Sequence, residues 1–197
     1  MTNCSIWVEG ITDRLYLRFF LDKYIAEGES NGENSREYLK YYKENLNYLF
    51  VEYQGSNLSH WMFSDEESEA DEISAKWLSN SIYLIADGDI SNYKDRVSRL
   101  QNELGSSFEL LQRKEIENYL PKEILVELAE TTFSRMHKKT KKGATIEGLK
   151  NLVNEDFDSL EGIGSILDFH ILGSNFEDNM VFRTNSGTIK NKVEFCK

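Results

Sequence analysis

Carboxylates stand where the sequence predicts buried strands to end. Glu9 follows the apolar run "CSIWV", and Asp13 lies four residues after it. Asp87 and Asp89 flank Gly88 directly after the run "SIYLIA". Crowded carboxylates repel one another and raise one another's pKa, and a bound cation removes that cost. Because hard oxygen ligands suit Mg²⁺ or Mn²⁺, and two such ions can flank a phosphate, the pattern predicts phosphodiester cleavage or transfer.

The elements around these residues are predicted to alternate between strand and helix. A further acidic pair, Glu115 and Glu117, follows the fourth predicted strand. Strands are expected over Cys4–Val8 (buried on both faces), Asn47–Tyr53, Ser81–Ala86 and Ser107–Gln112, and helices over Asp13–Ile25, 37–46 and Ser91–Leu104, near Asn57 and from Pro121. Such alternation is typical of an α/β domain with a mostly parallel sheet, in which ligands bind beyond the carboxyl ends of the strands.

Each acid also has an ordinary structural explanation. Asp13 lies in the first turn of a predicted helix, where an acid is favourable by ~0.3–1 kcal/mol. The sequence Asp87-Gly88-Asp89 is also typical of a simple turn, and Glu9 could form a strand-end salt bridge. The joint occurrence of these acids at strand ends favours a shared metal site.

Three segments, in order, carry a family resemblance. "VEGITD", "LIADGDIS" and "RKEIENYL" resemble the Toprim domain, and most closely its branch in the OLD-family (overcoming lysogenization defect) nucleases, over about Val8 to Leu120. The resemblance implies a Rossmann-like sheet with helices on both faces and a divalent-metal nuclease. It implies roles for the first-motif acids Glu9 and Asp13, the metal-binding Asp87, Asp89 and Glu117, and the helper Glu115.

The final segment "IKNKVEFCK" resembles the lysine-glycine-x-phenylalanine-alanine ending of many such domains. The alignment assigns the lysine to Lys192, while Val193 and Cys196 replace the glycine and the alanine. A lysine near bound metals could stabilise charge growing on a phosphate. A surface lysine on an edge strand is the alternative. We expect residues 1–125 to form the catalytic core and residues 126–197 a helical and strand extension that completes it.

The charge distribution limits how nucleic acid could be approached. The formal net charge of −11 opposes broad attraction to nucleic acid or to an anionic membrane. The dense basic run "HKKTKKG" is expected either to hold a nucleic-acid backbone beside the metal site or to form a solvated loop. Its lysines are Lys138, Lys139, Lys141 and Lys142.

Other features indicate a reducing compartment and no membrane segment. Cys4 and Cys196 suggest neither a disulfide framework nor zinc, and the histidines lack metal-ligand spacing. No apolar segment approaches the length of a membrane span, so we expect a cytoplasmic protein. "GIGSILDFHILG" is interpreted as turn and core.

We therefore expect a Mg²⁺- or Mn²⁺-dependent endonuclease that acts on DNA in preference to RNA, with two ions, and that takes part in defence against phage. Glu9 would bind metal or act as general base or acid. The chain lacks a G-x-x-x-x-G-K-[ST] phosphate loop, so an ATPase partner is expected in trans, with a homo-oligomer also compatible. Tyr38–Tyr48 and the acidic run Asp65–Glu72 are the candidate docking surfaces.

Three alternatives stay open: a catalytically silent interaction module of the same fold, a small RNA-processing Toprim nuclease, and a phosphatase that uses Asp87 as a nucleophile.

Overall fold

The computed structural model describes residues 4–64 and 73–195. Cys196 and the acidic run Asp65–Glu72 lie outside the described residues. The chain forms two compact units, which we call the N-terminal unit (Met1–Ala86 with Ile90–Leu110) and the C-terminal unit (Asp87–Asp89 with Leu111–Lys197). The division falls after Leu110, whereas the boundary expected at residue 125 lies inside helix α4, Lys122–Arg135.

The N-terminal unit is built on a four-stranded parallel sheet, which confirms the predicted α/β class. Its strands, in spatial order, are β2 (Leu49–Glu52), β1 (Cys4–Val8), β5 (Ser81–Ala86) and β6 (Phe108–Leu110). All three pairings are parallel, so the strands end at the same edge of the sheet. A separate two-stranded ladder pairs β3 (Trp61–Met62) with β4 (Ile73–Ser74).

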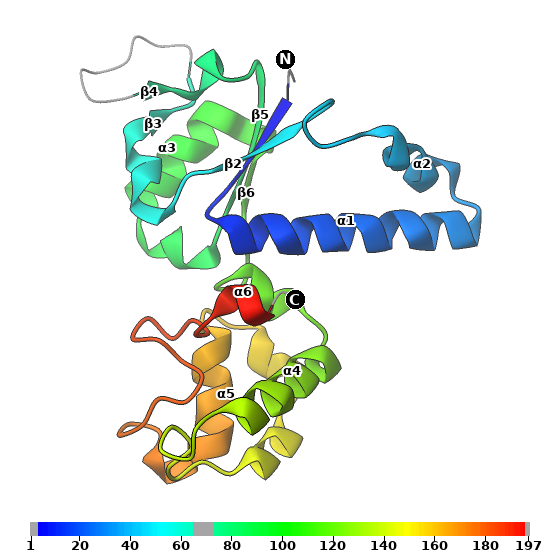
Figure 1. The fold of residues 1–197 in the computed structure, drawn as a ribbon. Coiled ribbons are helices and arrows are strands. Elements are labelled where there is room, and N and C mark those ends of the chain that lie inside the picture. Colours follow the sequence, from blue (N-terminus) through cyan, green and yellow to red (C-terminus); the bar gives the residue numbers. More distant parts are fainter. Residues whose placement is uncertain (1–3, 65–72, 196–197) are drawn as a thin grey trace. The chain divides into compact units, whose positions relative to one another are not determined.

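Helices cover the two faces of this sheet unequally. Figure 1 shows α3 (Lys94–Leu104) on one side and α1 (Ile11–Asn31) on the other. The connection from β1 to β2 through α1 and the connection from β5 to β6 through α3 run in opposite directions along the sheet, so right-handed crossovers place the two helices on opposite faces. The main core packs on the α3 side and comprises Trp7, Tyr53, Leu58, Phe63, Ala75, Ile82, Leu84, Ala86, Leu100 and Phe108. On the other face Ile6 is half-buried and Tyr83 is exposed. The expectation that Cys4–Val8 is buried on both faces is therefore wrong, because α1 covers its face only in part.

Helix α1 is longer than its apolar pattern predicts. It continues beyond Ile25 through polar residues that lie mostly exposed, and it ends where Gly32 adopts a left-handed conformation with φ 70°. The tyrosine-rich segment forms no long helix, because it breaks into α2 (Asn34–Glu37) and the 3₁₀ turn η1 (Tyr38–Tyr41). The helix expected near Asn57 is the 3₁₀ turn η2 (Gly55–His60).

The C-terminal unit is helical. Around α4 it places α5 (Ile163–Leu172) and α6 (Lys192–Phe195), with 3₁₀ turns at Ile116–Tyr119 (η6), Ile146–Asn151 (η7), Asn154–Phe157 (η8) and Gly173–Asn175 (η9). The segment interpreted as turn and core is in fact the buried helix α5. Lys192 begins α6 instead of lying on an edge strand. No helix within the described ranges has both the length and the apolar character needed to cross a membrane.

Candidate functional site

The acids of the first motif lie in the N-terminal unit, at the start of α1. Asp13 is 6% exposed, and its Oδ2 accepts the backbone N–H of Gly10 at 2.8 Å. This bond satisfies an amide at the helix start, which is the structural role that the sequence allows for Asp13. Glu9 is half-buried, and its backbone oxygen accepts the N–H of Gln54 at 2.8 Å.

The second acidic motif belongs to the C-terminal unit and depends on its glycine. Asp87 is half-buried and Asp89 is exposed, while Gly88 is buried between them. The N–H of Gly88 donates to the carbonyl oxygen of Arg113 at 3.1 Å. A Cβ at Gly88 would lie 2.2 Å from that oxygen and 2.7 Å from the carbonyl oxygen of Leu111. Only glycine fits this close approach to the backbone of Leu111 and Arg113. The hydrogen bond from Gly88 to Arg113 thus joins the loop of Asp87 and Asp89 to the segment that carries the third motif.

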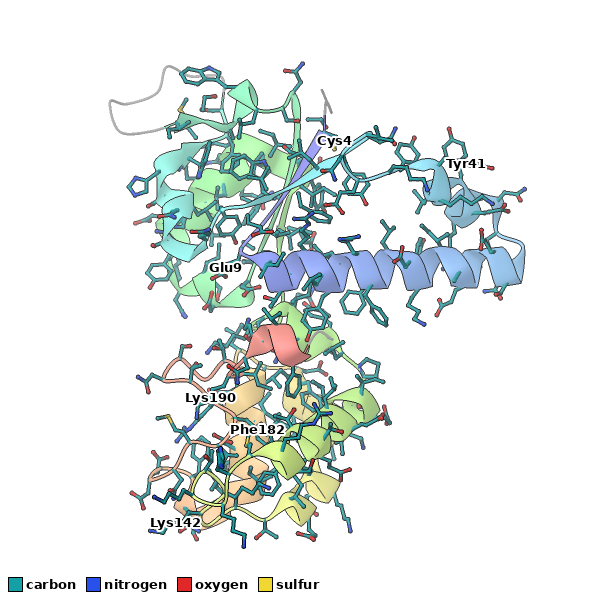
Figure 2. The ribbon with its side chains drawn as sticks, viewed as in Figure 1. Cys4, Glu9, Tyr41, Lys142, Phe182 and Lys190 are labelled. Carbon is teal, nitrogen blue, oxygen red and sulfur yellow. The ribbon has the colours of Figure 1, made fainter. Side chains whose placement is uncertain are left out.

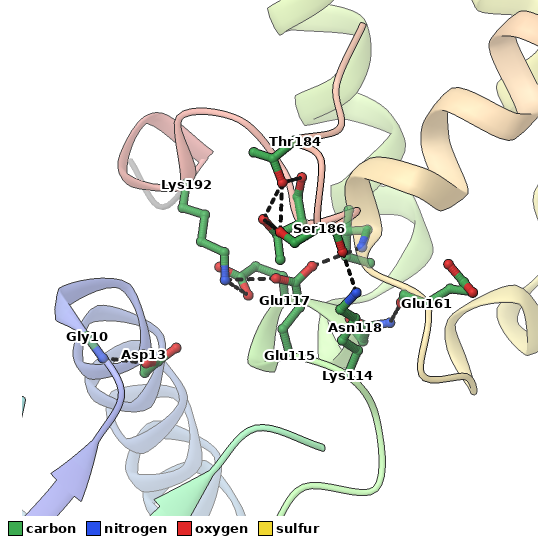
Figure 3. A network of polar contacts seen from close by, with 12 residues as sticks. Gly10, Asp13, Lys114, Glu115, Glu117, Asn118, Glu161, Thr184, Ser186 and Lys192 are labelled. Carbon is green, nitrogen blue, oxygen red and sulfur yellow. Dashed lines mark hydrogen bonds and ion pairs between the residues drawn. The ribbon is translucent and has the colours of Figure 1, made fainter. Parts of the chain in front are cut away.

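The third motif forms a buried acidic pair with a lysine between its members. Glu115 and Glu117 are 1% and 0% exposed. The ammonium of Lys192 lies 2.8 Å from Oε2 of Glu115 and 3.2 Å from Oε2 of Glu117. Figure 3 shows the Lys192 side chain reaching from α6 toward both glutamates. We call these three residues the Glu–Lys cluster.

The two glutamates of the cluster differ in their surroundings. Oε1 of Glu115 accepts the N–H of Ile163 at 3.0 Å, at the N-terminus of α5, where the helix dipole favours a negative charge. Glu115 thus links α5 to Lys192 and has a clear structural role. Oε2 of Glu117 accepts a hydrogen bond from Lys192 at 3.2 Å.

The charge of Lys192 is set by opposing effects. Burial favours the neutral amine and would by itself lower the pKa of Lys192. The carboxylates of Glu117, Glu115 and Asp87 outweigh burial and raise the pKa of Lys192 above its ordinary value. Lys192 is therefore a cation at any physiological pH.

The side chains of the C-terminal unit suit a hard divalent cation in their chemistry. Four carboxylates stand in its second and third motifs: Asp87, Asp89, Glu115 and Glu117. Oxygen donors of this kind are the ligands that Mg²⁺ and Mn²⁺ prefer. Across residues 4–64 and 73–195, however, no three or more acidic, histidine or cysteine side chains are already grouped so as to hold a metal ion. The donor set fits, while Lys192 occupies the space between two of its members.

Two further buried polar residues hold the C-terminal unit around the cluster, and sequence reasoning missed both. Asn118 Nδ2 donates to the carbonyl oxygens of Phe157 at 3.3 Å and of Glu161 at 3.0 Å. Asn118 thereby ties the third motif to the segment that precedes α5.

Asp168 is the second. It is fully buried, and it accepts the backbone N–H groups of Val181, Phe182 and Arg183 at 2.9, 2.7 and 3.1 Å. It thus fixes the segment that leads toward α6. A single acid inside the apolar run "SILDFHIL" was the available signal, because a lone charge there must find buried partners.

The basic run lies away from the Glu–Lys cluster. Lys138, Lys139 and Lys142 are exposed, whereas Lys141 is half-buried, donates to the carbonyl oxygen of Ser134 at 3.2 Å and packs over the Phe133 ring. Figure 2 shows Lys142 at the end of the C-terminal unit remote from α6. The run is therefore not beside the cluster, and contact with nucleic acid remains a prediction.

A pocket of about 270 Å³ opens elsewhere in the C-terminal unit, beside α5. It is lined by Asp156, Ser159, Glu161, Ser165, Ile166, Phe169, His170 and Phe176. His170 Nε2 lies 3.3 Å from Oδ2 of Asp156 within it. None of the predicted site residues lines this pocket, so it does not identify the chemistry of the Glu–Lys cluster.

Comparisons of the chain with protein-family models, with curated proteins and with solved structures gave no match.

Proposed function

We propose that the chain is a Mg²⁺- or Mn²⁺-dependent Toprim-type endonuclease that cleaves phosphodiester bonds of DNA. The observation that carries the proposal is the complete burial of Glu115 and Glu117 next to one lysine. Burying a carboxylate costs several kcal/mol unless it is paired, and such groups concentrate at functional sites. The ammonium of Lys192 lies within ion-pair distance of both carboxylates, so these buried oxygens are placed where they can hold a cation.

The residues that would hold metal are Asp87, Asp89 and Glu117, with Glu115 as a helper. When bound, a divalent ion neutralises charge on a phosphodiester and activates water for attack. The ammonium of Lys192 would stabilise negative charge that develops on the phosphate. The resemblance to the Toprim motifs adds Glu9 and Asp13 as candidates, with Glu9 as a metal ligand or general base.

An ATPase partner and a role in defence against phage belong to the same proposal. The net charge of −11 supports a partner that supplies a basic surface for nucleic acid. Three tyrosines of the proposed docking segment are exposed, namely Tyr38, Tyr41 and Tyr42. Large exposed aromatic groups are enriched at protein interfaces. Co-purification from the native host, followed by nuclease assays with and without the bound protein, tests this part.

Incubation with supercoiled plasmid tests the nuclease directly. We expect nicking with Mg²⁺ or Mn²⁺, none with EDTA, and little with an RNA substrate of equal length. Asp87→Asn should abolish nicking, and Glu155→Gln, which changes an exposed acid of the same unit, should leave it intact. Full activity of Asp87→Asn, or nicking that persists in EDTA, would contradict the proposal.

One observation favours a second candidate, the catalytically silent interaction module. Lys192 already pairs with both buried glutamates, and the described part of the chain holds no ready-made metal-ligand group. If the cluster is purely structural, millimolar Mg²⁺ and Mn²⁺ will leave the melting temperature unchanged and no nucleic acid will be cut.

A further inference from the structure

The Glu–Lys cluster already contains a cation, and that cation is part of the chain. The Lys192 ammonium contacts one oxygen of each buried glutamate, at 2.8 and 3.2 Å. Both contacts are ion pairs, and the one to Glu117 is also a hydrogen bond. The ammonium therefore stands where the proposed function requires a metal ion to reach the same carboxylate oxygens.

The two kinds of cation are not electrostatically equal. A lysine brings a single charge to two buried carboxylates, with Asp87 near enough to add to the negative potential. A divalent ion brings twice that charge, and it also meets the preference of Mg²⁺ and Mn²⁺ for oxygen ligands. Exchange of the ammonium for a divalent ion is thus favoured by charge and opposed by the dehydration of the ion.

The lysine can leave without unfolding the unit. A quarter of its side chain is exposed, so the side chain already meets solvent. The backbone around it is held by other groups, because Phe195 in the same helix is buried and its N–H donates to the carbonyl oxygen of Asn191 at 3.3 Å. Rotation of the four-carbon stem of Lys192 is enough to move the ammonium while α6 stays in place.

We propose that Lys192 is a built-in competitor of metal binding: its ammonium fills the site between Glu115 and Glu117 until a divalent ion displaces it. The inference rests on the metal assignment of the proposed function. The apo protein is thereby stabilised and kept inactive at low metal concentration. Once displaced, the ammonium is free to approach the phosphate, where the sequence resemblance assigns it a role.

Mn²⁺ titration by calorimetry on the full chain tests this competition. Lys192→Met should bind Mn²⁺ at least tenfold more tightly than the wild type, because no ammonium has to be displaced. In EDTA, Lys192→Met should melt at a lower temperature than the wild type, since two buried carboxylates each lose an ion pair. Mn²⁺ should raise the melting temperature of Lys192→Met by more than it raises that of the wild type.

Two further variants serve as controls. Lys192→Arg keeps a cation in the cluster, so its affinity for Mn²⁺ should not exceed that of the wild type. Lys190→Met removes a neighbouring half-buried lysine whose ammonium bonds the carbonyl oxygens of Met180 and Val181, and it should leave the affinity unchanged. If Lys192→Met folds only when Mn²⁺ is present, Mn²⁺ has replaced the ammonium between the two glutamates, and the competition is supported.

The outcomes separate this inference from the proposed function. Wild-type protein that binds Mn²⁺ and nicks DNA, together with Lys192→Met that binds no more tightly, would overturn the competition alone. A tenfold gain in Lys192→Arg or Lys190→Met would overturn it as well. If neither the wild type nor Lys192→Met binds Mn²⁺ or responds to it in melting, the metal assignment and the competition both fail.

Discussion

Replacing Gly88 by alanine should destabilise the C-terminal unit through one contact. The added methyl would lie 2.2 Å from the carbonyl oxygen of Arg113 and 2.7 Å from that of Leu111, and both obstacles are backbone atoms that cannot rotate away. Overpacking of this kind costs about 1–3 kcal/mol, and the shift would also weaken the 3.1 Å bond from Gly88 N–H to Arg113. The weakened bond adds about 0.5–1.5 kcal/mol, so the free energy of unfolding should fall by about 1.5–4.5 kcal/mol.

Urea unfolding followed by circular dichroism measures this loss, and Gly10→Ala is the matched control. Gly10 also precedes a helix next to an acidic motif, but beyond its chain neighbours no atom lies within 4 Å of the position that an added methyl would take, and its φ of −157° suits any residue. Gly10→Ala should change the free energy of unfolding by no more than about 0.5 kcal/mol. Equal effects of the two substitutions would refute the claim that the Arg113 contact selects glycine at position 88.

Three other predictions concern buried charge and metal. Asp168→Asn should lower the free energy of unfolding by about 3 kcal/mol in urea titrations, because three backbone N–H groups lose a charged acceptor, while the exposed Asp178→Asn should have almost no effect. Carboxylates raise the pKa of Lys192 above its ordinary value of 10.5, so its ion pairs are present at every pH below 10.5 and are lost only above the raised pKa. The difference in unfolding free energy between the wild type and Lys192→Met should therefore be the same at about pH 7 as at about pH 9.5. Asp89→Asn should abolish plasmid nicking while its melting temperature in EDTA stays at or above that of the wild type, since removing a charge relieves repulsion in the acidic motifs.

The parallel sheet was predictable because its strands are short apolar runs that end in glycine and acidic residues. "CSIWV" before Glu9-Gly10 and "SIYLIA" before Asp87-Gly88 give both the element and its end. The full length of α1 was not predictable from apolar periodicity, because its last turns are polar and mostly solvent-exposed. Gly32, which ends the helix, was a visible stop signal that the polar composition obscured.

The candidate site was predictable in its residue types and not in its contacts. The order of the three motifs predicts Glu115 and Glu117 as site residues, and the resemblance at the C-terminal segment predicts Lys192. That Lys192 lies between the two glutamates depends on packing across 75 positions of sequence, which no local pattern encodes. The same holds for Asp168, whose three partners lie 13 to 15 residues away along the chain.

Mn²⁺ binding followed by electron paramagnetic resonance tests the central claim most directly, because the signal of free Mn²⁺ falls as ions bind. We expect wild-type protein to remove Mn²⁺ from solution saturably, and Glu117→Gln to do so at least tenfold more weakly while keeping its fold by circular dichroism. The exposed substitution Glu155→Gln should bind as the wild type does. Equal binding by Glu117→Gln and the wild type, or no binding by either, would contradict the assignment of the buried acids as a metal site.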